Sequence, residues 1–397
     1  MLGILSRSKY RDLILGLTLL CTGAALVFYP EQSMDAGRQG LQLCANVIIP
    51  SLFPFFVLSS LVVELGMARY LGQALERLMW PLFRVGGVGA SALVLGLVGG
   101  YPVGAQTAIK LYEKNLCSKD ETQRLLSFCN NSGPAFILGV VGAGVFGSGA
   151  IGLLLYLSHA AACLCVGLLF RFYGKSTVCS GPSRTTPHFQ TTRFSTALTS
   201  GIKNSFTSVL NICAFVLFFS VVIRLLFLCG IMDAAAGLLA ALLSPVGFDR
   251  VLARQLLTGL LEVSSGVTSL SLSGELPGQI SMAAFMLGWA GLSVHCQVLS
   301  FLGDSGLSPG TYLIGKALHG TISALFTILL SRVFPLPQTV SSYLAEQAET
   351  LATLDAGSIL PFFAVSAGLL WVLFLSANAL MVRRAKKRSG NERRYAL

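Results

Sequence analysis

Leu93–Thr107 reads LVLGLVGGYPVGAQT, an apolar run that begins like a membrane helix and then interrupts itself. The Gly-Gly pair brings no side chains to the helix, and Pro102 lacks a backbone donor. In hydrocarbon, backbone groups freed by such a break cost several kcal/mol each, so protein or a water-filled cavity must surround it. Gln106 and Thr107 directly follow the break and can bind a polar ligand. The stretch predicts a membrane helix broken beside a cavity.

A second interrupted apolar stretch, Leu256–Leu272, reads LLTGLLEVSSGVTSLSL and lies in the other half of the chain. Paired broken segments at corresponding positions of two halves are the best sequence indication of a transporter's binding site. Residues 40–172 and 201–334 align around these breaks as two repeats, in a register that places His159 over His319. Each repeat has three crossings, an odd number, so the second is predicted to be inverted relative to the first.

The composition indicates an all-α polytopic membrane protein. Of the 397 residues, 54% are hydrophobic and 11% are charged, and the mean hydropathy is +0.73. A soluble domain carries about 25% charged residues. The net charge of +11 does not indicate nucleic-acid binding, because the basic residues lie at the ends of predicted spans. The ten cysteines form no CxxC pair and favour buried apolar positions over disulfides or a metal site.

Apolar runs predict eight full spans besides the two interrupted stretches. The third is short for a crossing of about 20 residues and is expected to begin earlier, near Phe128. Ser118 and Glu121 form a capping box, which predicts the start of a solvated connecting helix on the cytoplasmic surface. The predicted spans are Leu13–Tyr29, Asn46–Leu65, Gly133–Val145, Ile151–Phe172, Phe206–Cys229, Ile280–Leu302, Tyr312–Phe334 and Ile359–Val382.

The distribution of lysine and arginine predicts whether the interrupted stretches cross. If both re-enter and leave on the side they came from, 22 of the 28 basic residues are cytoplasmic and only Arg38, Arg250 and Arg254 lie outside. If they crossed, residues 171–205, with five basic and no acidic residues, would face outward, against the positive-inside bias. Two re-entrant hairpins and cytoplasmic termini are therefore predicted. In order, the chain is divided into an N-terminal span (1–39), the first repeat (40–172), a cytoplasmic linker (173–200), the inverted second repeat (201–334), an external linker (335–358), and a final span with a basic cytoplasmic tail (359–397).

Polar residues also stand where two of the predicted spans approach the breaks. Residues 130–134, Asn-Asn-Ser-Gly-Pro, open the third span as a helix N-terminus, which carries about half a positive charge and suits an anionic ligand. The corresponding place in the second half is 290–297, AGLSVHCQ. Helical spacing puts Ser293 and Gln297 on one face there, with His295 elsewhere.

Ionisable residues within the apolar stretches need an explanation. Glu262 stands just before Ser264, and a carboxylate at membrane depth indicates function by default. Two roles are open: a carboxyl that carries a proton or coupling ion near the substrate, and a cap on the freed amides of its own hairpin. Lys316 is expected to extend its side chain to the cytoplasmic face, whereas Arg224 lies deeper and requires a partner. The two aligned histidines are expected to be packing residues.

Four motifs together resemble a known family: IIPSLFPFFVLSSL (48–61), GGYPVGAQT (99–107), NNSGP (130–134) and LEVSSG (261–266). The chain resembles sporulation integral membrane proteins of the YlbJ (SpoVV) type, in the wider nucleoside-recognition gate-domain family, akin to concentrative nucleoside transporters. The resemblance covers about residues 40–335 and implies a carrier of dipicolinic acid in the outer forespore membrane. By position it implies substrate contacts from Tyr101, Pro102, Gly104, Gln106 and Thr107, from Asn130, Asn131 and Ser132, and from Glu262, Ser264 and Ser265.

We therefore expect a multi-pass secondary carrier for a small organic anion, which the resemblance identifies as dipicolinate. The sequence has no Walker loop, HExxH or GxSxG motif, so no catalytic residue, metal ligand or cofactor is assigned. The expected partners are the anionic substrate and the lipid bilayer, without nucleic acid. A homo-oligomer and the identity of the coupling ion, H+ or Na+, are left open. The alternatives are a nucleoside or nucleobase carrier and a non-transporting membrane scaffold of spore assembly.

Overall fold

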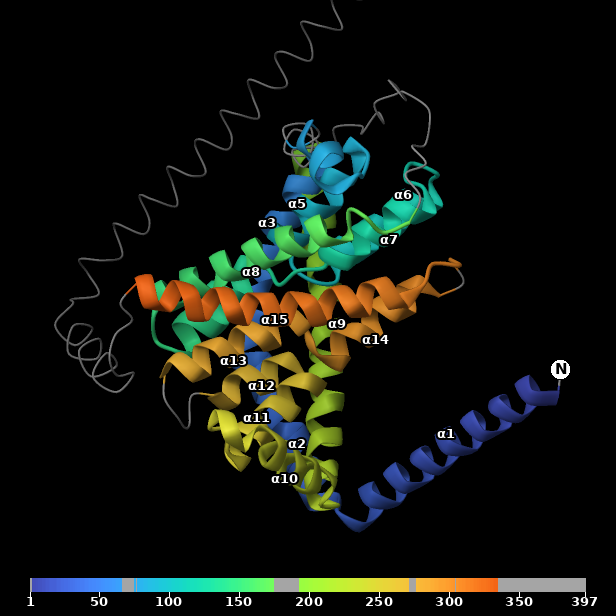
Figure 1. Cartoon of the computed structure of the whole chain (residues 1–397), viewed down its shortest axis with the longest axis vertical. Coiled ribbons are helices and arrows are strands. Elements are labelled where there is room, and N and C mark those ends of the chain that lie inside the picture. The colour runs from blue at the N-terminus through green and yellow to red at the C-terminus, as the bar shows by residue number, and fades with distance from the viewer. Residues whose placement is uncertain are drawn as a thin grey trace, which may run out of the picture. The chain divides into compact units, whose positions relative to one another are not determined.

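The computed structural model describes residues 2–65, 75, 77–174, 193–270, 276–303 and 305–334, all within one compact unit, Met1–Leu336. All regular secondary structure in these residues is helical (Figure 1), which confirms the predicted all-α class. Residues 175–192 of the predicted linker, the external linker and the final span with its tail lie outside the described residues, and their topology stays a prediction.

Four helices of the described part are long and apolar enough to cross a membrane: α8 (Gly149–Phe170), α9 (Phe194–Leu228), the α13–α14 pair (Leu276–Leu302) and α15 (Pro309–Val333). Each covers most of one predicted span, and helices are favoured there because a helix satisfies its own backbone groups in lipid. Two bent helix pairs raise the number of candidate spans among the described residues to six. The predicted total of eight stays a prediction.

The N-terminal part consists of α1 (Leu2–Phe28), α2 (Pro30–Leu43), a π-helical turn (Cys44–Ile48) and α3 (Ile49–Glu64). Both α2 and α3 pack along α9. The helix α9 is 35 residues long and begins at Phe194, twelve residues before its predicted start, so it extends into the predicted linker. The reason is that polar residues at its start are compatible with a helix outside the apolar span.

The first interrupted stretch forms a helical hairpin, as predicted. A short 3₁₀ turn (Gly87–Gly89) leads into α5 (Ala90–Gly99), and the chain turns at Gly100, whose φ of +75° favours glycine, into α6 (Val103–Glu113). The helices α5 and α6 pack against each other. A Cβ atom on Gly104 would overlap the Cys129 carbonyl group, and so would one on Gly96. These glycines therefore let the hairpin touch the chain after α7 backbone to backbone.

The second interrupted stretch forms an equivalent hairpin. After α10 (Ile231–Leu243) and a 3₁₀ turn (Ser244–Val246), α11 (Arg250–Leu261) and α12 (Val263–Ser269) pack together, with the break at Glu262. A Cβ atom on Gly266 would overlap the Gly259 backbone, and one on Gly259 would meet the Met286 side chain at 2.5 Å. Small residues again allow the two arms and a neighbouring helix to come into close contact.

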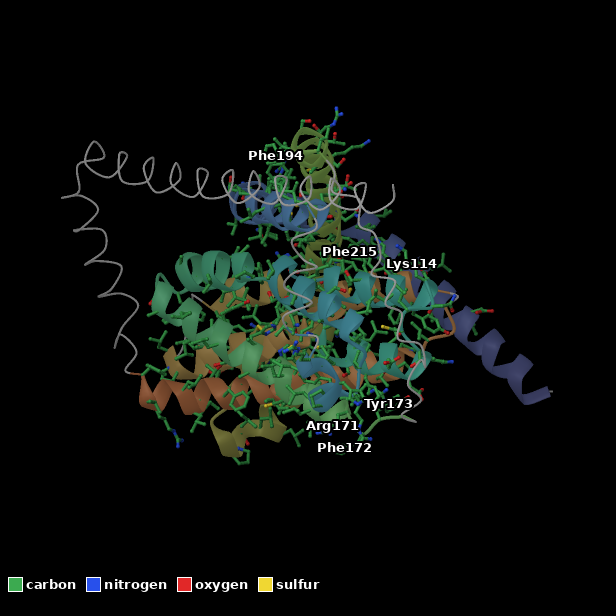
Figure 2. The ribbon with its side chains drawn as sticks, turned by 90° about the horizontal axis from the view of Figure 1, so that it is seen from above. Lys114, Arg171, Phe172, Tyr173, Phe194 and Phe215 are labelled. Carbon is green, nitrogen blue, oxygen red and sulfur yellow. The ribbon has the colours of Figure 1, made fainter. Side chains whose placement is uncertain are left out.

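The helix before the third span corrects two expectations. The capping box is present: Glu121 Oε2 accepts a hydrogen bond from Ser118 N at 2.9 Å, and α7 (Lys119–Phe128) follows. However, α7 is buried between α6, α8 and α15 and is not solvated. Arg124 donates a hydrogen bond to the carbonyl group of Tyr173 at 2.7 Å. Tyr173, which Figure 2 labels, follows the end of α8. The third span also does not begin near Phe128, because residues 129–133 are unwound before the π-helix Ala135–Val145.

The span predicted at Ile280–Leu302 is likewise broken, into α13 (Leu276–Trp289) and α14 (Gly291–Leu302). The break is at Ala290, with φ +79°, and Gly291, with φ +81°. Since alanine rarely adopts a backbone conformation with positive φ, local propensity does not explain the break. A Cβ atom on Gly291 would lie 3.0 Å from Val263 N, so the break lies against the tip of the second hairpin.

The helix α15 lies between α8 and α13 (Figure 1) and packs against both. Its contact with α13 is close because Gly320 and Gly288 bring the two backbones together. On its other side, the imidazole rings of His159 and His319 are 4.2 Å apart between centroids. The predicted repeat register aligned these two histidines, and the fold brings them into contact at the centre of the packed helices.

Candidate functional site

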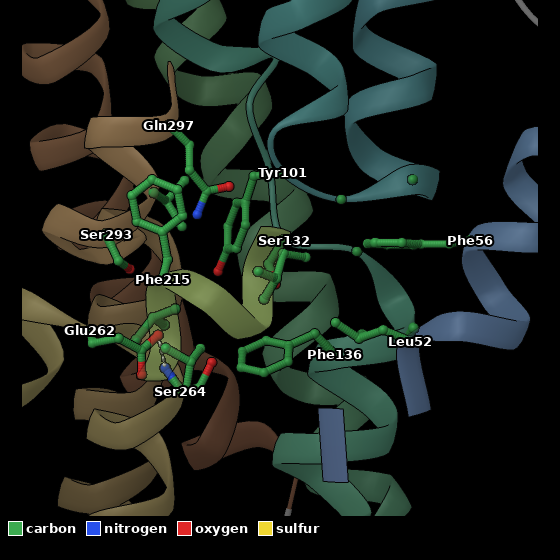
Figure 3. A pocket seen from close by; sticks show the side chains of 18 of the residues that line it. Leu52, Phe56, Tyr101, Ser132, Phe136, Phe215, Glu262, Ser264, Ser293 and Gln297 are labelled. Atoms are coloured by element: carbon green, nitrogen blue, oxygen red, sulfur yellow. Dashed lines mark hydrogen bonds between the residues drawn. The ribbon is translucent and has the colours of Figure 1, made fainter. Parts of the chain in front are cut away.

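One cavity gathers the tips of both hairpins and two broken spans (Figure 3). The broken spans are the unwound segment that leads into the π-helix Ala135–Val145, and the pair α13–α14. The space in the cavity that a water-sized molecule can occupy is about 40 Å³. The elements that form it are α3, the first hairpin tip, the unwound segment after α7, α9, the second hairpin tip and α14. Its lining consists of Leu52, Phe56, Val98, Gly99, Gly100, Tyr101, Ser132, Gly133, Ala135, Phe136, Ile212, Phe215, Val216, Glu262, Val263, Ser264, Ser293, Val294 and Gln297.

The lining combines aromatic surface with a few polar groups. Figure 3 shows the rings of Tyr101 and Phe215 and the amide of Gln297 turned toward the same space. Tyr101 and Ser132 also line it. Neither of their hydroxyl groups forms a hydrogen bond with the backbone of the described residues. Apolar walls with a small number of placed polar groups are typical of small-molecule sites.

Glu262 ends one helix and begins the next at the edge of this cavity. Its side chain is 1% exposed. Its Oε1 atom accepts a hydrogen bond from Ser264 N at 3.0 Å, and its Oε2 atom accepts one from Ser265 N at 2.6 Å. Within the described part of the chain it forms no ion pair. The cap that was one of the two expected roles is therefore present, whereas the proton- or ion-carrying role stays a prediction.

The remaining candidates on the first hairpin lie beside the cavity lining or away from it. Pro102 directly precedes α6, and Gly104 forms the close contact with Cys129. Thr107 donates its hydroxyl hydrogen to the Val103 carbonyl group of its own helix at 2.8 Å. Neither Thr107 nor Gln106 is part of the cavity lining in this conformation.

The two asparagines of the unwound segment form hydrogen bonds within the protein. The amide nitrogen of Asn130 donates to the Tyr312 hydroxyl group at 3.3 Å, and that of Asn131 donates to the Phe128 carbonyl group at 3.0 Å. Both side chains are fully buried and do not line the cavity. Ser132 does line it, and its backbone N–H donates to His159 Nε2 at 3.0 Å. Ser265 lies outside this cavity and lines a second one.

Comparison with known proteins agrees with this architecture. The family model described as Gate: Nucleoside recognition matches residues 45–214. The sporulation integral membrane protein YlbJ of Bacillus subtilis (strain 168) is 32% identical over 340 residues, which are 81% of this chain and 83% of that protein. The chain belongs to the YlbJ family. It is a multi-pass helical membrane protein.

Two solved structures show the fold that this YlbJ-family chain shares. A CNTnw variant in the intermediate 2 state has a TM-score of 0.53 and 12% identity, over 82% of this chain and 86% of that one. A doubly substituted CNTnw variant in an outward-facing state has a TM-score of 0.51 and 13% identity, over 82% and 85%. At this identity the likeness establishes the CNT fold and nothing about the ligand.

Several lining residues of the YlbJ-family cavity were not among the sequence candidates. Ser293 and Gln297 both line it, and their shared helix face was visible in the sequence. His295 points elsewhere, and its Nδ1 atom lies 3.0 Å from the Tyr312 hydroxyl group. Phe136 and Phe215 gave no local signal, because aromatic residues are common on membrane helices whether or not they line a site.

Two basic residues that the sequence singled out, Lys316 and Arg224, can now be placed in the fold. Lys316 does not reach the cytoplasmic surface but is 1% exposed, and its ammonium group donates to the Asn130 carbonyl group at 2.9 Å. Arg224 lines a second, wider cavity between α2, α9 and α12, in which a water-sized molecule can occupy about 380 Å³. This second cavity receives neither the first hairpin nor the broken spans, so the first cavity is the better candidate for a binding site.

Proposed function

We propose that this YlbJ-family protein is a secondary carrier for a small aromatic organic anion, with pyridine-2,6-dicarboxylate (dipicolinate) as its substrate. The observation that carries the proposal is the cavity at which two broken hairpins and two broken spans meet. Broken helices at a shared central site are the arrangement that alternating-access carriers use to bind substrate. The membership in a sporulation membrane protein family supports the outer forespore membrane as its location.

The lining suits a planar ring that carries carboxylates. Aromatic side chains such as Tyr101 and Phe215 offer faces on which a heteroaromatic ring can stack. The hydroxyl group of Ser132 and the amide group of Gln297 can donate hydrogen bonds to carboxylate oxygens. The π-helix Ala135–Val145 and α14 both begin at the cavity, and the positive end of a helix dipole favours an anion. The apolar remainder excludes water and strengthens these interactions.

Reconstituted transport tests the proposal directly. Proteoliposomes that contain the purified full chain should accumulate labelled pyridine-2,6-dicarboxylate under an imposed H+ or Na+ gradient, and protein-free liposomes should not. Excess unlabelled substrate inside the vesicles should accelerate uptake by counterflow. The absence of uptake and of counterflow under both gradients would contradict the carrier proposal and favour the scaffold alternative.

A nucleoside or nucleobase carrier is the second candidate. Two observations favour it: the matching family model is described as nucleoside recognition, and the fold is that of CNT structures. The same aromatic walls and amide donors would bind a base and its hydroxyl groups. Competition decides between the two, because uridine should not inhibit uptake of pyridine-2,6-dicarboxylate if the first proposal holds. Uptake of labelled uridine that the dicarboxylate fails to inhibit would favour the second.

A further inference from the structure

Lys316 is a buried lysine without an acidic partner in the described part of the chain. Its side chain is 1% exposed. The ion pairs among the described residues join Arg38 to Asp35 and Arg254 to Asp233, and none involves Lys316. Lysine is almost never fully buried unless it is paired, and an ionisable residue inside a membrane protein indicates function by default. The position of this ammonium group therefore requires an explanation.

The fold places Lys316 at the centre through its neighbour in the sequence. A Cβ atom on Gly315 would overlap the Ser127 backbone, so α15 passes directly against the end of α7. This contact directs the next residue toward the unwound segment that follows α7. The Lys316 ammonium group donates to the freed carbonyl oxygen of Asn130 at 2.9 Å and thereby satisfies one backbone group of the break.

The other groups around the ammonium are neutral. His319 Nε2 lies 2.9 Å from the His159 carbonyl oxygen, which can only accept, so Nε2 carries the hydrogen. His319 Nδ1 is then free to accept from Lys316 Nζ, 3.5 Å away. The ring of Tyr101 lies on a third side, with its centroid 5.9 Å from Nζ. These contacts satisfy the donors of the ammonium group, but none of them neutralises its positive charge.

The Lys316 ammonium group lies close to the cavity. The Tyr101 ring, whose centroid is 5.9 Å from Lys316 Nζ, also lines the cavity. Ser132, two residues after the carbonyl group that Lys316 binds, lines it as well. On another wall, the Glu262 carboxylate already accepts two backbone N–H groups. We propose that Lys316 is the residue that makes this cavity select negatively charged substrates, an inference that rests on the carrier function proposed above.

In this conformation Lys316 acts through its electric field and is a positioning residue for the anion. Two unit charges about 8 Å apart at an effective dielectric constant of about 20 interact strongly enough to change an affinity by on the order of 30-fold. The affinity for an uncharged ligand of the same shape should be almost unaffected by the charge of Lys316. The ratio of the two affinities therefore isolates the charge from any loss of packing.

The test compares the affinities of pyridine-2,6-dicarboxylate and of its neutral analogue pyridine-2,6-dicarboxamide for the purified full chain. Affinity is measured by thermal-shift titration. The variant Lys316→Met keeps the length of the side chain and removes the charge. The matched control Arg224→Met removes a positive charge that lines the second cavity. We expect Lys316→Met to weaken dicarboxylate binding by about 30-fold and dicarboxamide binding by less than about threefold. Arg224→Met should leave the ratio of the two affinities unchanged.

Each other outcome overturns the inference. An equal loss of affinity for both ligands, together with a lower melting temperature, would show that Lys316 only supports the fold. An unchanged ratio in a stable variant would show that its charge does not reach the ligand. If the unsubstituted protein binds neither ligand, the proposed function fails before any variant is tested, and the inference fails with it.

Discussion

Replacement of Glu262 by glutamine separates the two roles that a buried carboxylate can have at the second hairpin. In the structure its two oxygens accept backbone hydrogen bonds from Ser264 N at 3.0 Å and Ser265 N at 2.6 Å. Glutamine offers one acceptor oxygen and turns an N–H donor toward the other amide. A hydrogen bond to a charged group contributes about 1.5–3 kcal/mol, and a buried donor left without a partner costs about 1–3 kcal/mol. Glu262→Gln should therefore destabilise the hairpin by about 2–5 kcal/mol.

Two measurements on the purified variant decide between the roles. Thermal unfolding monitored in detergent should show a lower melting temperature if the cap is needed. Counterflow of pyridine-2,6-dicarboxylate at two pH values should keep its pH dependence if Glu262 is only a cap. If Glu262 instead carries a proton, glutamine mimics the protonated side chain, and exchange should persist without any pH dependence.

Glu121 offers a matched control for the cap. It is also a buried capping glutamate, and its oxygens accept from Gly86 N at 2.9 Å and from Ser118 N at 2.9 Å, but it does not line the cavity. Glu121→Gln should lower the melting temperature by a comparable amount and leave ligand affinity and the pH profile unchanged. A Glu262→Gln protein that unfolds at the wild-type temperature would refute the capping argument, and wild-type pH dependence in that stable variant would exclude both roles.

Two further substitutions test the packing and the lining. Gly104→Ala places a methyl group in the Cys129 carbonyl group, which is backbone and cannot turn away, so it should cost at least about 1–3 kcal/mol and reduce the yield of folded protein. Gly139→Ala, whose Cβ atom meets nothing within 4 Å, is its control, and equal stability of the two variants would contradict the close approach. Gln297→Ala should weaken substrate binding by about 1–3 kcal/mol, because its amide lines the cavity. Gln106→Ala should weaken binding less, and the reverse order in a binding titration would restore the sequence hypothesis for Gln106.

The candidate site was predicted from sequence where its residues lie at a break in a helix. Glu262 was identified because a carboxylate interrupts an apolar run at a definite place, and Tyr101 was a candidate through the family resemblance of the motif that contains the first break. Gln106 was a candidate because it follows the break, yet one turn of helix carries it away from the lining. Phe215 was not found, since its place in the cavity depends on how α9 is rotated against the hairpins.

The sequence by itself determined the all-helical membrane class, the two hairpins and the capping box at Ser118. These features follow from the chemistry of single residues and their neighbours within about one turn, such as a missing amide hydrogen or a side chain that caps a helix. Only the tertiary structure decided that α7 is buried, that the chain breaks at Ala290, and that Lys316 is buried near Tyr101 instead of reaching the surface. Burial and a left-handed backbone at alanine depend on which segments pack alongside. Those contacts join residues far apart in the chain, as when Gly315 meets Ser127, and no local pattern specifies them.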